Sequence, residues 1–316
     1  MNIVLTGAGG FVGKHLLNSL NEHNVVVLGR QRPKGLREER FLEVDLESPG
    51  GSYEILKGAD VLIHCAGRAH IMEGNDVSDV ERYRNINTKG TLELAKQAAK
   101  YAIKRFIFIS TVKVNGEYTE LGKPFKADDL PDPKDPYAVS KYEAELGLQE
   151  ISKSTGMEVV VIRPPLIYGE GVKGNLKSMI TSMKNGIPLP FGGIKSNLRS
   201  LVSVDNLVDL ILTCAVHPMA ANKTFLVSDD NDISTAQLLN EMSNGMGVRN
   251  RSISVPESLL NCLAKLFRRE ELSKRLLGSL QVDISETKLT LGWKPPYSIE
   301  QSMRKIANCN SQRRGN

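Results

Sequence analysis

The stretch "TGAGGFVG", residues 6–13, stands between an apolar run and a segment whose apolar positions recur at helical spacing. Gly7, Gly10 and Gly13 allow the backbone to approach a phosphate, and a helix that starts behind them supplies free N–H groups and positive dipole character. A strand before the glycines and a helix after them is the context in which this spacing indicates a dinucleotide site. A tight turn without a ligand is the alternative. The sequence therefore predicts a nucleotide-binding βαβ unit at this point.

Short apolar runs alternate with helix-like segments through the first half of the chain. The runs are β-branched and almost continuously apolar, which is typical of a parallel sheet with helices on both faces. After Tyr168 glycine and proline become frequent and strand-like runs become fewer. We predict an α/β protein with a Rossmann-type doubly wound parallel sheet over residues 1–168. A smaller mixed α/β substrate lobe is expected over residues 169–316, with some segments returning to the first domain.

The composition restricts the surroundings of the protein. The net charge of +5 is modest, and we expect no nucleic-acid partner. The four cysteines have neither metal-ligand spacing nor a dense disulfide pattern, which predicts a reducing compartment and no metal site. A strand and a loop stand where a signal peptide would lie, and no apolar run approaches the roughly 20 residues that span a bilayer. We therefore expect a cytoplasmic protein without a membrane span.

Residues 256–280 are apolar at helical spacing and basic on the other side. This pattern is typical of a helix packed in a second lobe, and it also occurs in helices that lie on a membrane surface. We predict the packed helix. Peripheral membrane attachment with a lipid-linked sugar as substrate is the alternative.

The end of the second apolar run, in "VVVLGRQRPK" (residues 25–34), indicates which dinucleotide is bound. An acidic residue there would bind the ribose 2′-hydroxyl of NAD, whereas arginine pairs with the 2′-phosphate of NADP. Gly29, Arg30 and Arg32 stand where the carboxylate would be. The sequence therefore favours NADP(H), with NAD(H) as the alternative. Asp45 is expected either to contact the adenine or to cap the end of its strand.

Tyr137 and Lys141 in "YAVSK" lie four residues apart, on one face of a predicted helix. A phenol with an ordinary pKa of about 10 is a poor acid or base at neutral pH, and a nearby ammonium stabilises the phenolate. Thr111 in "STVKVNG" (residues 110–116) follows another apolar run, and its hydroxyl is placed to hold a substrate oxygen beside the phenol. Thr111, Tyr137 and Lys141 are therefore the catalytic candidates.

These motifs, taken together, resemble those of extended short-chain dehydrogenases/reductases of the nucleotide-sugar epimerase/dehydratase type. The resemblance covers nearly the whole chain and rests on "TGAGGFVG", "VLIHCAG", "NINTKGT", "STVKVNG", "YAVSK", "RPPLIYG" and "LGWKPP". It implies a nucleotide-sugar substrate, a catalytic role for the three candidates and a homodimer formed through residues 88–102 and 137–154. The cofactor-binding residues that we expect are Gly7, Gly10, Phe11, Val12, Gly13, Arg30, Asp45, Leu46, Cys65, Ala66, Gly67, Asn87, Tyr137, Lys141 and Pro164.

The two residues after Thr111 restrict the reaction. Dehydratases of this family carry an Asp-Glu pair there, which handles the elimination of water, whereas this chain has Val112 and Lys113. The resemblance therefore argues against dehydration and leaves hydride transfer at a sugar carbon, either once in a reductase or out and back in an epimerase. "HCAGRAHIME" and "STVKVNGE" resemble a bacterial surface-polysaccharide branch of the family, whose members act at C4 of UDP-sugars. The substrate contacts that this implies are Arg68, His70, Thr111, Lys113, Asn175 and Arg199.

Simpler interpretations exist for three of these residues: an exposed loop histidine for His70, a loop cap for Asn175 and a surface salt bridge for Arg199. Asn115 stands where many epimerases of the family carry tyrosine. We therefore predict a reductase of a UDP-4-keto-6-deoxy-N-acetylhexosamine, used for surface polysaccharide (O-antigen or capsule) synthesis. A UDP-glucose or UDP-N-acetylglucosamine 4-epimerase with tightly bound NAD is the alternative. A non-catalytic NADP-sensing scaffold is disfavoured because the three catalytic candidates are retained.

Overall fold

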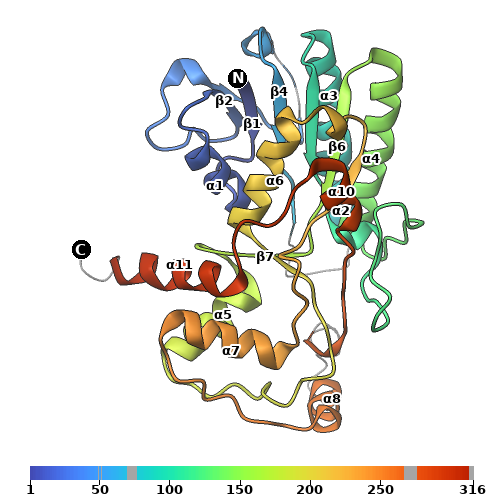
Figure 1. Cartoon of the computed structure of the whole chain (residues 1–316). Coiled ribbons are helices and arrows are strands. Elements are labelled where there is room, and N and C mark those ends of the chain that lie inside the picture. Colours follow the sequence, from blue (N-terminus) through green and yellow to red (C-terminus); the bar gives the residue numbers. More distant parts are fainter. Residues whose placement is uncertain (49, 51, 70–76, 267–275, 313–316) are drawn as a thin grey trace.

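The computed structural model describes the chain except for residues 49, 51, 70–76, 267–275 and 313–316. Seven parallel strands form its central sheet (Figure 1). In their order across the sheet they are β3 (Phe41–Glu43), β2 (Asn24–Gly29), β1 (Asn2–Thr6), β4 (Val61–His64), β5 (Arg105–Ile109), β6 (Glu158–Arg163) and β9 (Thr224–Leu226). The chain proceeds outward from β1 to β3 and then, in the other direction, from β4 to β9. Ligands of such sheets bind at the strand carboxyl ends where the direction changes, here between β1 and β4.

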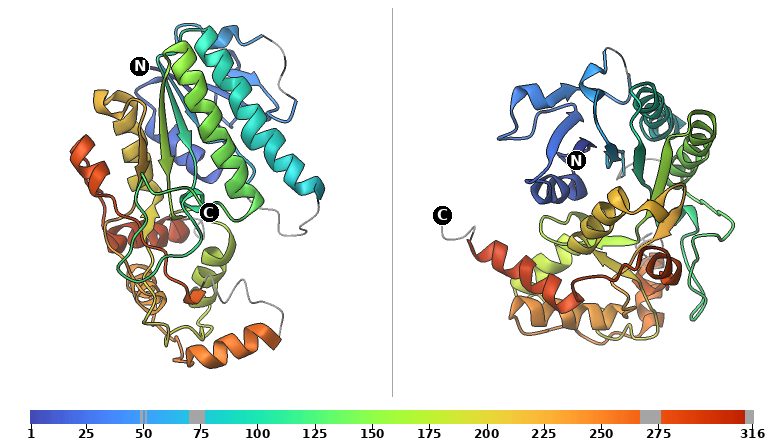
Figure 2. Two further views of the ribbon diagram at one scale, coloured as in Figure 1. Left: turned by 90° about the vertical axis from the view of Figure 1, so that its right-hand side faces the viewer. Right: turned by 45° about the horizontal axis from the view of Figure 1, so that its top comes forward.

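Alternate side chains of each strand enter two separate cores. Ile3 and Leu5 of β1 pack in the core on one face of the sheet, whereas Val4 packs in the core on the other. The first face is covered by α1 (Phe11–Ser19), α6 (Val204–Val216) and α10 (Ser285–Leu291), and the second by α3 (Thr91–Lys100) and α4 (Pro136–Thr155). Figure 2 shows α3 and α4 side by side along the sheet. Because both faces are covered, the strands are apolar at successive positions, and the predicted doubly wound fold is confirmed.

Short helical segments connect these elements. Residues 88–102, one of the two ranges expected at the dimer contact, begin in a π-helical segment and continue through α3. The connecting segments are η1 (Glu38–Arg40), η2 (Glu54–Leu56), α2 (Val77–Tyr83), the π-helical η3 (Arg84–Gly90), η4 (Val112–Val114) and η5 (Pro218–Ala220). π-helical segments are rare in proteins, and those that occur are often found at functional sites. The π-helical segment η3 carries Asn87.

The helix α4 begins and ends where its local sequence requires. Asp135 Oδ1 accepts a hydrogen bond from the backbone N–H of Ala138 at 2.7 Å, and Pro136 occupies the first turn, where its missing N–H is not needed. Gly156 ends the helix with φ at +77°, the left-handed conformation that glycine adopts without strain. These signals place the start of α4, with Tyr137 and Lys141, at the carboxyl edge of the sheet.

A second group of elements lies below the sheet in Figure 1. It comprises β7 (Leu166–Tyr168) and β8 (Leu201–Ser203), which pair in parallel, and the helices α5 (Gly174–Lys184), α7 (Thr235–Met246), α8 (Glu257–Leu266) and α11 (Ile299–Gln312). The Ser234 hydroxyl caps α7 by accepting the Gln237 N–H at 3.1 Å. The strand β9 belongs to the main sheet, and the helices α6 and α10 cover one of its faces, although all three follow residue 168. The domain boundary at residue 168 stays a prediction.

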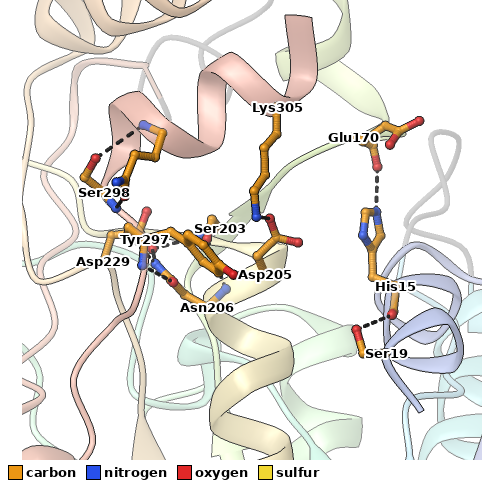
Figure 3. Close-up of polar contacts among 11 residues, drawn as sticks. His15, Ser19, Glu170, Ser203, Asp205, Asn206, Asp229, Tyr297, Ser298 and Lys305 are labelled. Carbon is orange, nitrogen blue, oxygen red and sulfur yellow. Dashed lines mark hydrogen bonds and ion pairs between the residues drawn. The ribbon is translucent and has the colours of Figure 1, made fainter. Parts of the chain in front are cut away.

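A buried polar cluster joins the two groups of elements (Figure 3). Asp229 accepts hydrogen bonds from the backbone N–H of Ser203 at 2.9 Å and from Asn206 Nδ2 at 2.6 Å, and Tyr168 Oη donates to it at 2.6 Å. Asn206 also binds the backbone of Tyr297, which precedes α11, at 2.8 and 3.0 Å. Burial raises the pKa of Asp229, whereas these three hydrogen bonds act in the opposite direction. The cluster fixes α11 against α6.

No helix in the described part of the chain is both long enough and apolar enough to cross a bilayer. The helix predicted over residues 256–280 is present as α8 in its first part. The middle of that prediction, residues 267–275, lies outside the described residues.

Candidate active site

The loop between β1 and α1 leaves no room for a side chain at Gly7 or Gly13. Gly7 has φ at +74°, and a Cβ on it would lie 2.6 Å from Ala66 N. A Cβ on Gly13 would lie 2.1 Å from Gly7 O, and Gly10 N donates to that same oxygen at 2.8 Å. Gly10 caps α1 without a side-chain acceptor, so the first N–H groups of the helix are available to an anion. The pyrophosphate of a dinucleotide fits this backbone cradle.

Two threonines hold the imidazole of His64 beside this loop. Thr6 Oγ1 is hydrogen-bonded to His64 Nδ1 at 2.7 Å, and Thr91 Oγ1 to His64 Nε2 at 2.9 Å. Thr6 Oγ1 also accepts the Ala66 N–H at 3.2 Å. Burial, with the charge of Lys141 as a smaller cause, lowers the pKa of His64 to about 3. The neutral imidazole therefore ties the ends of β1 and β4 together and fixes the backbone of residues 65–67.

Asn87 joins the segment after β4 to the helix α4. Its Oδ1 accepts the Arg68 N–H at 2.8 Å, and its Nδ2 donates to Arg68 O at 3.1 Å and to Ser140 Oγ at 3.0 Å. A Cβ on Gly67 would lie 3.2 Å from Asn87 Oδ1 and 3.7 Å from Lys141 Nζ. Gly67, Asn87 and Lys141 therefore lie together as one wall of the candidate dinucleotide site at the carboxyl ends of β1 and β4.

Tyr137, Lys141 and Thr111 meet where α4 begins and β5 ends. The phenol of Tyr137 is hydrogen-bonded to Thr111. Its ring centroid lies 6.0 Å from that of Tyr83. Lys141 Nζ lies over the Phe108 ring, 4.0 Å from its centroid. The three catalytic candidates are thus brought together, and their catalytic roles stay a prediction.

The ionisation of Tyr137 and Lys141 is governed by burial. Burial raises the pKa of Tyr137, with the charges of Asp135 and Tyr83 as further causes, and the Thr111 hydrogen bond acts in the opposite direction. Burial also lowers the pKa of Lys141 to about 7, against the charges of Glu145 and Cys65, which raise it. We expected the ammonium to bring the phenol toward neutral pH. Because burial outweighs the other causes, the phenol is instead protonated at neutral pH, which is the state of a proton donor.

Other predicted cofactor residues lie around the carboxyl edge of the sheet. Phe11 and Val12 begin α1, and Arg30 follows β2 with an exposed side chain. Asp45 Oδ1 accepts the Glu47 N–H at 3.0 Å, which is the predicted alternative of a cap after its strand.

The remaining cofactor candidates flank the catalytic cluster. A Cβ on Gly90 would lie 2.4 Å from Leu46 O, so Leu46 packs directly on the π-helical segment η3. Burial raises the pKa of Cys65 to about 12, so its thiol is neutral. Pro164 O accepts the Val112 N–H at 3.0 Å, next to Thr111.

The predicted substrate residues are spread over both groups of elements. Arg68 Nε is buried and has no hydrogen-bond partner among the described residues. Lys113 forms an ion pair with Asp135 and lies 3.9 Å from Glu117.

Two predicted substrate residues lie in the second group of elements. Asn175 is exposed in the first turn of α5, and Lys173, not Asn175, occupies its N-cap position. Arg199 Nη1 donates to Gly278 O at 3.1 Å. His70 lies outside the described residues, so the prediction for it stays open.

Four residues that no sequence motif indicated surround the cluster of catalytic candidates, namely His64, Asp135, Glu145 and Arg163. For two of them a local signal exists. Asp135 precedes a proline at a helix start, a pattern typical of an N-cap, and Glu145 continues the four-residue spacing of Tyr137 and Lys141. His64 and Arg163 end apolar strands, and only their contacts reveal what they bind.

Comparison with known proteins places the chain among enzymes of nucleotide sugars. Residues 3–228 match the model of the NAD dependent epimerase/dehydratase family. The chain is 46% identical over 309 residues to the UDP-glucose 4-epimerase of Vibrio cholerae, covering 97% of this chain and 94% of that protein. It is 28% identical over 315 residues to the GDP-6-deoxy-D-mannose reductase of Pseudomonas aeruginosa, covering 96% of this chain and 95% of that protein.

Solved structures share the fold over the whole chain. The UDP-glucose 4-epimerase of Thermotoga maritima, solved with UDP-glucose, has a TM-score of 0.76 at 22% identity and 99% coverage of both chains. RMD from Pseudomonas aeruginosa, complexed with NADPH, has a TM-score of 0.74 at 25% identity, with 98% of this chain and 99% of that chain covered. As its motifs predicted, the chain belongs to the NAD dependent epimerase/dehydratase family.

Proposed function

We propose that the protein catalyses oxidation–reduction at C4 of a UDP-sugar with a nicotinamide dinucleotide as cofactor. The observation that carries the proposal is the cluster of the partly buried Tyr137 with the buried Lys141 and Thr111 beside the glycine loop. The Vibrio cholerae relative, a UDP-glucose 4-epimerase, supports the reaction at C4 and the UDP-sugar. Arg68 Nε has no hydrogen-bond partner among the described residues, and its positive charge beside Asn87 supports an anionic ligand at the same wall.

The residues of the cluster have distinct roles in this proposal. Tyr137 donates its proton to the sugar oxygen, Thr111 holds that oxygen, and the charge of Lys141 stabilises the phenolate that remains. Gly7, Gly10 and the residues 65–67 hold the dinucleotide, which when bound exchanges a hydride with the sugar carbon. Exclusion of water by the buried walls strengthens these interactions.

Net reduction with NADPH is the outcome that we favour. Gly29, Arg30 and Arg32 stand at the end of β2, and the first acidic residue after that strand is Glu38. An arginine there fits the 2′-phosphate of NADPH. The substrate proposed is a UDP-4-keto-6-deoxy-N-acetylhexosamine of surface-polysaccharide synthesis.

A UDP-sugar 4-epimerase is the second candidate, because the Vibrio cholerae relative is named as one at 46% identity. In that reaction Tyr137 acts first as a base and then returns the proton, and NAD stays bound through the cycle. The same catalytic residues serve both outcomes, so the residues around the cofactor decide between them.

Identification of the retained cofactor separates the two candidates. The protein is purified without added dinucleotide and denatured, and any released dinucleotide is identified by mass spectrometry. Retained NAD would support the epimerase and contradict the role given to Arg30. An empty protein that binds NADPH and discriminates against NADH supports the reductase.

The enzyme proposal itself is tested with Tyr137→Phe. We expect turnover of the ketosugar or UDP-sugar to collapse while dinucleotide binding is retained. Tyr142→Phe, on the same helix, is the matched control and should leave turnover unchanged. Full activity of Tyr137→Phe would contradict the proposed chemistry.

The proposal extends to the oligomeric state of the protein and its place in the cell. We place the protein in the cytoplasm as a homodimer formed through α3 and α4, and Leu146 on α4 exposes 45% of its surface. Light scattering tests the dimer, which a monomeric wild type would exclude. Attachment to membranes is disfavoured, and its test is co-sedimentation with liposomes, from which we expect the protein to be absent.

A further inference from the structure

We propose that Glu145 is a positioning residue of this active site. Held by Arg163 and Ser110, it keeps Lys141 charged and joins the catalytic face of α4 to the end of the strand that carries Thr111. The inference deepens the proposed function and rests on it, because it assigns a purpose to the charge on Lys141.

Three donors surround the buried carboxylate of Glu145. Arg163 Nε donates to Oε1 at 3.1 Å and Nη2 to Oε2 at 2.6 Å, and the Ser110 hydroxyl also donates to Oε1. Glu145, Arg163 and Ser110 are 1%, 5% and 3% exposed. A guanidinium that binds both oxygens, together with a hydroxyl donor, favours the ionised carboxylate. The side chain of Glu145 is therefore held in one position inside the protein by a guanidinium and a hydroxyl.

The same guanidinium reaches the segment after β5. Arg163 Nη1 donates to Asn115 Oδ1 at 3.0 Å, and Asn115 Nδ2 donates to Lys126 O at 2.8 Å. Ser110 directly precedes Thr111, so the network binds both ends of the turn that holds the Thr111 hydroxyl. A shift of α4 relative to β5 would break several of these hydrogen bonds at once. The network therefore fixes the distance between Thr111 on its strand and Tyr137 on its helix.

Glu145 also acts on the charge of Lys141. The two residues lie one turn apart on the same face of α4. Two further titratable groups of this region, His64 at the end of β4 and Cys65 directly after it, are neutral at neutral pH, because burial lowers the pKa of His64 to about 3 and raises that of Cys65 to about 12. Glu145 is thus the carboxylate that raises the pKa of Lys141 against the effect of burial. Since burial brings the pKa of Lys141 to about 7, loss of that support changes its charge near neutral pH.

A purely structural ion pair is the competing explanation, and the double variant Glu145→Leu/Arg163→Met separates the two. Apolar residues of similar volume often replace a buried ion pair without loss of stability. If the pair only held α4 to the sheet, the folded double variant would keep wild-type activity and the wild-type titration of Lys141. If Glu145 is a positioning residue, the variant folds but both properties change.

The direct readout is the titration of Lys141 by NMR of labelled lysine side chains, with Lys141→Met to assign the signal. We expect the pKa of Lys141 to fall by about one unit in Glu145→Gln, which removes the negative charge alone, and by less in the double variant, which also removes the positive charge of Arg163. Glu150→Gln is the matched control, because Glu150 lies on the same helix but is exposed and pairs with Lys153 at 2.8 Å. In Glu150→Gln the pKa of Lys141 should equal that of the wild type.

Turnover gives the second readout. The alkaline limb of the pH–rate profile should move to lower pH in the folded variants, in step with the titration. An unchanged Lys141 titration in a folded double variant, verified by circular dichroism, overturns the inference. If the double variant does not fold, an unchanged Lys141 titration in Glu145→Gln overturns it equally. The titration needs no substrate, so it stands even if the proposed reaction is wrong.

Discussion

Lys113 forms an ion pair with Asp135, the residue whose carboxylate caps the helix that carries Tyr137. Lys113 occupies one of the two positions where dehydratases carry an acidic pair. The positive charge of Lys113 lies against a carboxylate that raises the pKa of Tyr137. The residue expected to face the substrate thus also acts on the catalytic phenol.

Lys113→Met should raise the pKa of Tyr137, because it leaves the charge of Asp135 uncompensated. Both side chains are about a third exposed, so we expect a shift on the order of a few tenths of a unit. The measurement is the pH–rate profile, in which the limb that belongs to Tyr137 moves to higher pH. Lys134→Met removes a more exposed ion pair with Asp132 and serves as control. Equal profiles for the two variants would contradict the prediction.

Lys141→Met should stabilise the fold at neutral pH while it abolishes turnover. The pKa of Lys141 is lowered from 10.5 to about 7 in the folded state. Between these pH values Lys141 is therefore neutral in the folded protein and takes up a proton on unfolding. The wild-type free energy of unfolding therefore rises across this window, and the cost of burying Lys141 is greatest at and below its lower limit.

The check is thermal unfolding of the wild type and Lys141→Met over a pH series. Each kcal/mol of stabilisation corresponds to roughly 2–4 °C in melting temperature for a chain of this size class. The difference between the two proteins should shrink as the pH rises toward 10.5. Lys153→Met, at an exposed site on the same helix, should show no such trend. A difference that is independent of pH would refute the burial argument.

His64→Leu should lower stability at neutral pH and remove part of its acid dependence. The variant removes the imidazole partner of the buried Thr91 hydroxyl and leaves Thr6 Oγ1 with the Ala66 N–H alone, at a cost of about 1–3 kcal/mol. In the wild type the pKa of His64 is lowered from 6.5 to about 3. The neutral His64 therefore contributes its full stabilisation above pH 6.5, and this stabilisation is lost as the pH falls from 6.5 toward about 3.

Urea unfolding at several pH values measures both effects. The variant should lose less stability than the wild type across the His64 window, by at most about 1.4 kcal/mol per pH unit. His23→Leu, at a position where the wild-type imidazole is partly exposed, is the control and should follow the wild-type acid dependence. Parallel stability curves for the wild type and His64→Leu would show that His64 does not titrate in the core.

Arg30→Ala should weaken NADPH binding and leave NADH binding almost unchanged. A charge-assisted hydrogen bond is worth about 1.5–3 kcal/mol, which corresponds to at least a tenfold change in affinity. Fluorescence titration with both dinucleotides gives the ratio. Arg37→Ala, an exposed arginine in the same loop that lies 3.8 Å from Glu39, is the control. An equal loss for NADPH and NADH would mean that Arg30 does not read the 2′-phosphate.

The sequence by itself determined the fold class, because the signals for it are local. Strands covered on both faces must be apolar at successive positions, and the turn from β1 to α1 needs Gly7 and Gly13 because any Cβ would collide with the backbone. The spacing of Tyr137 and Lys141 likewise needs only the pitch of one helix.

Only the tertiary structure decided how the site is held and charged. The partners of His64, Glu145 and Lys113 come from other elements, and a sequence pattern does not indicate which distant side chain a buried polar group will meet. The expected shift of the Tyr137 pKa was wrong for the same reason. That pKa is set by the depth of burial and by the surrounding charges, both of which arise only when the strands and helices pack together.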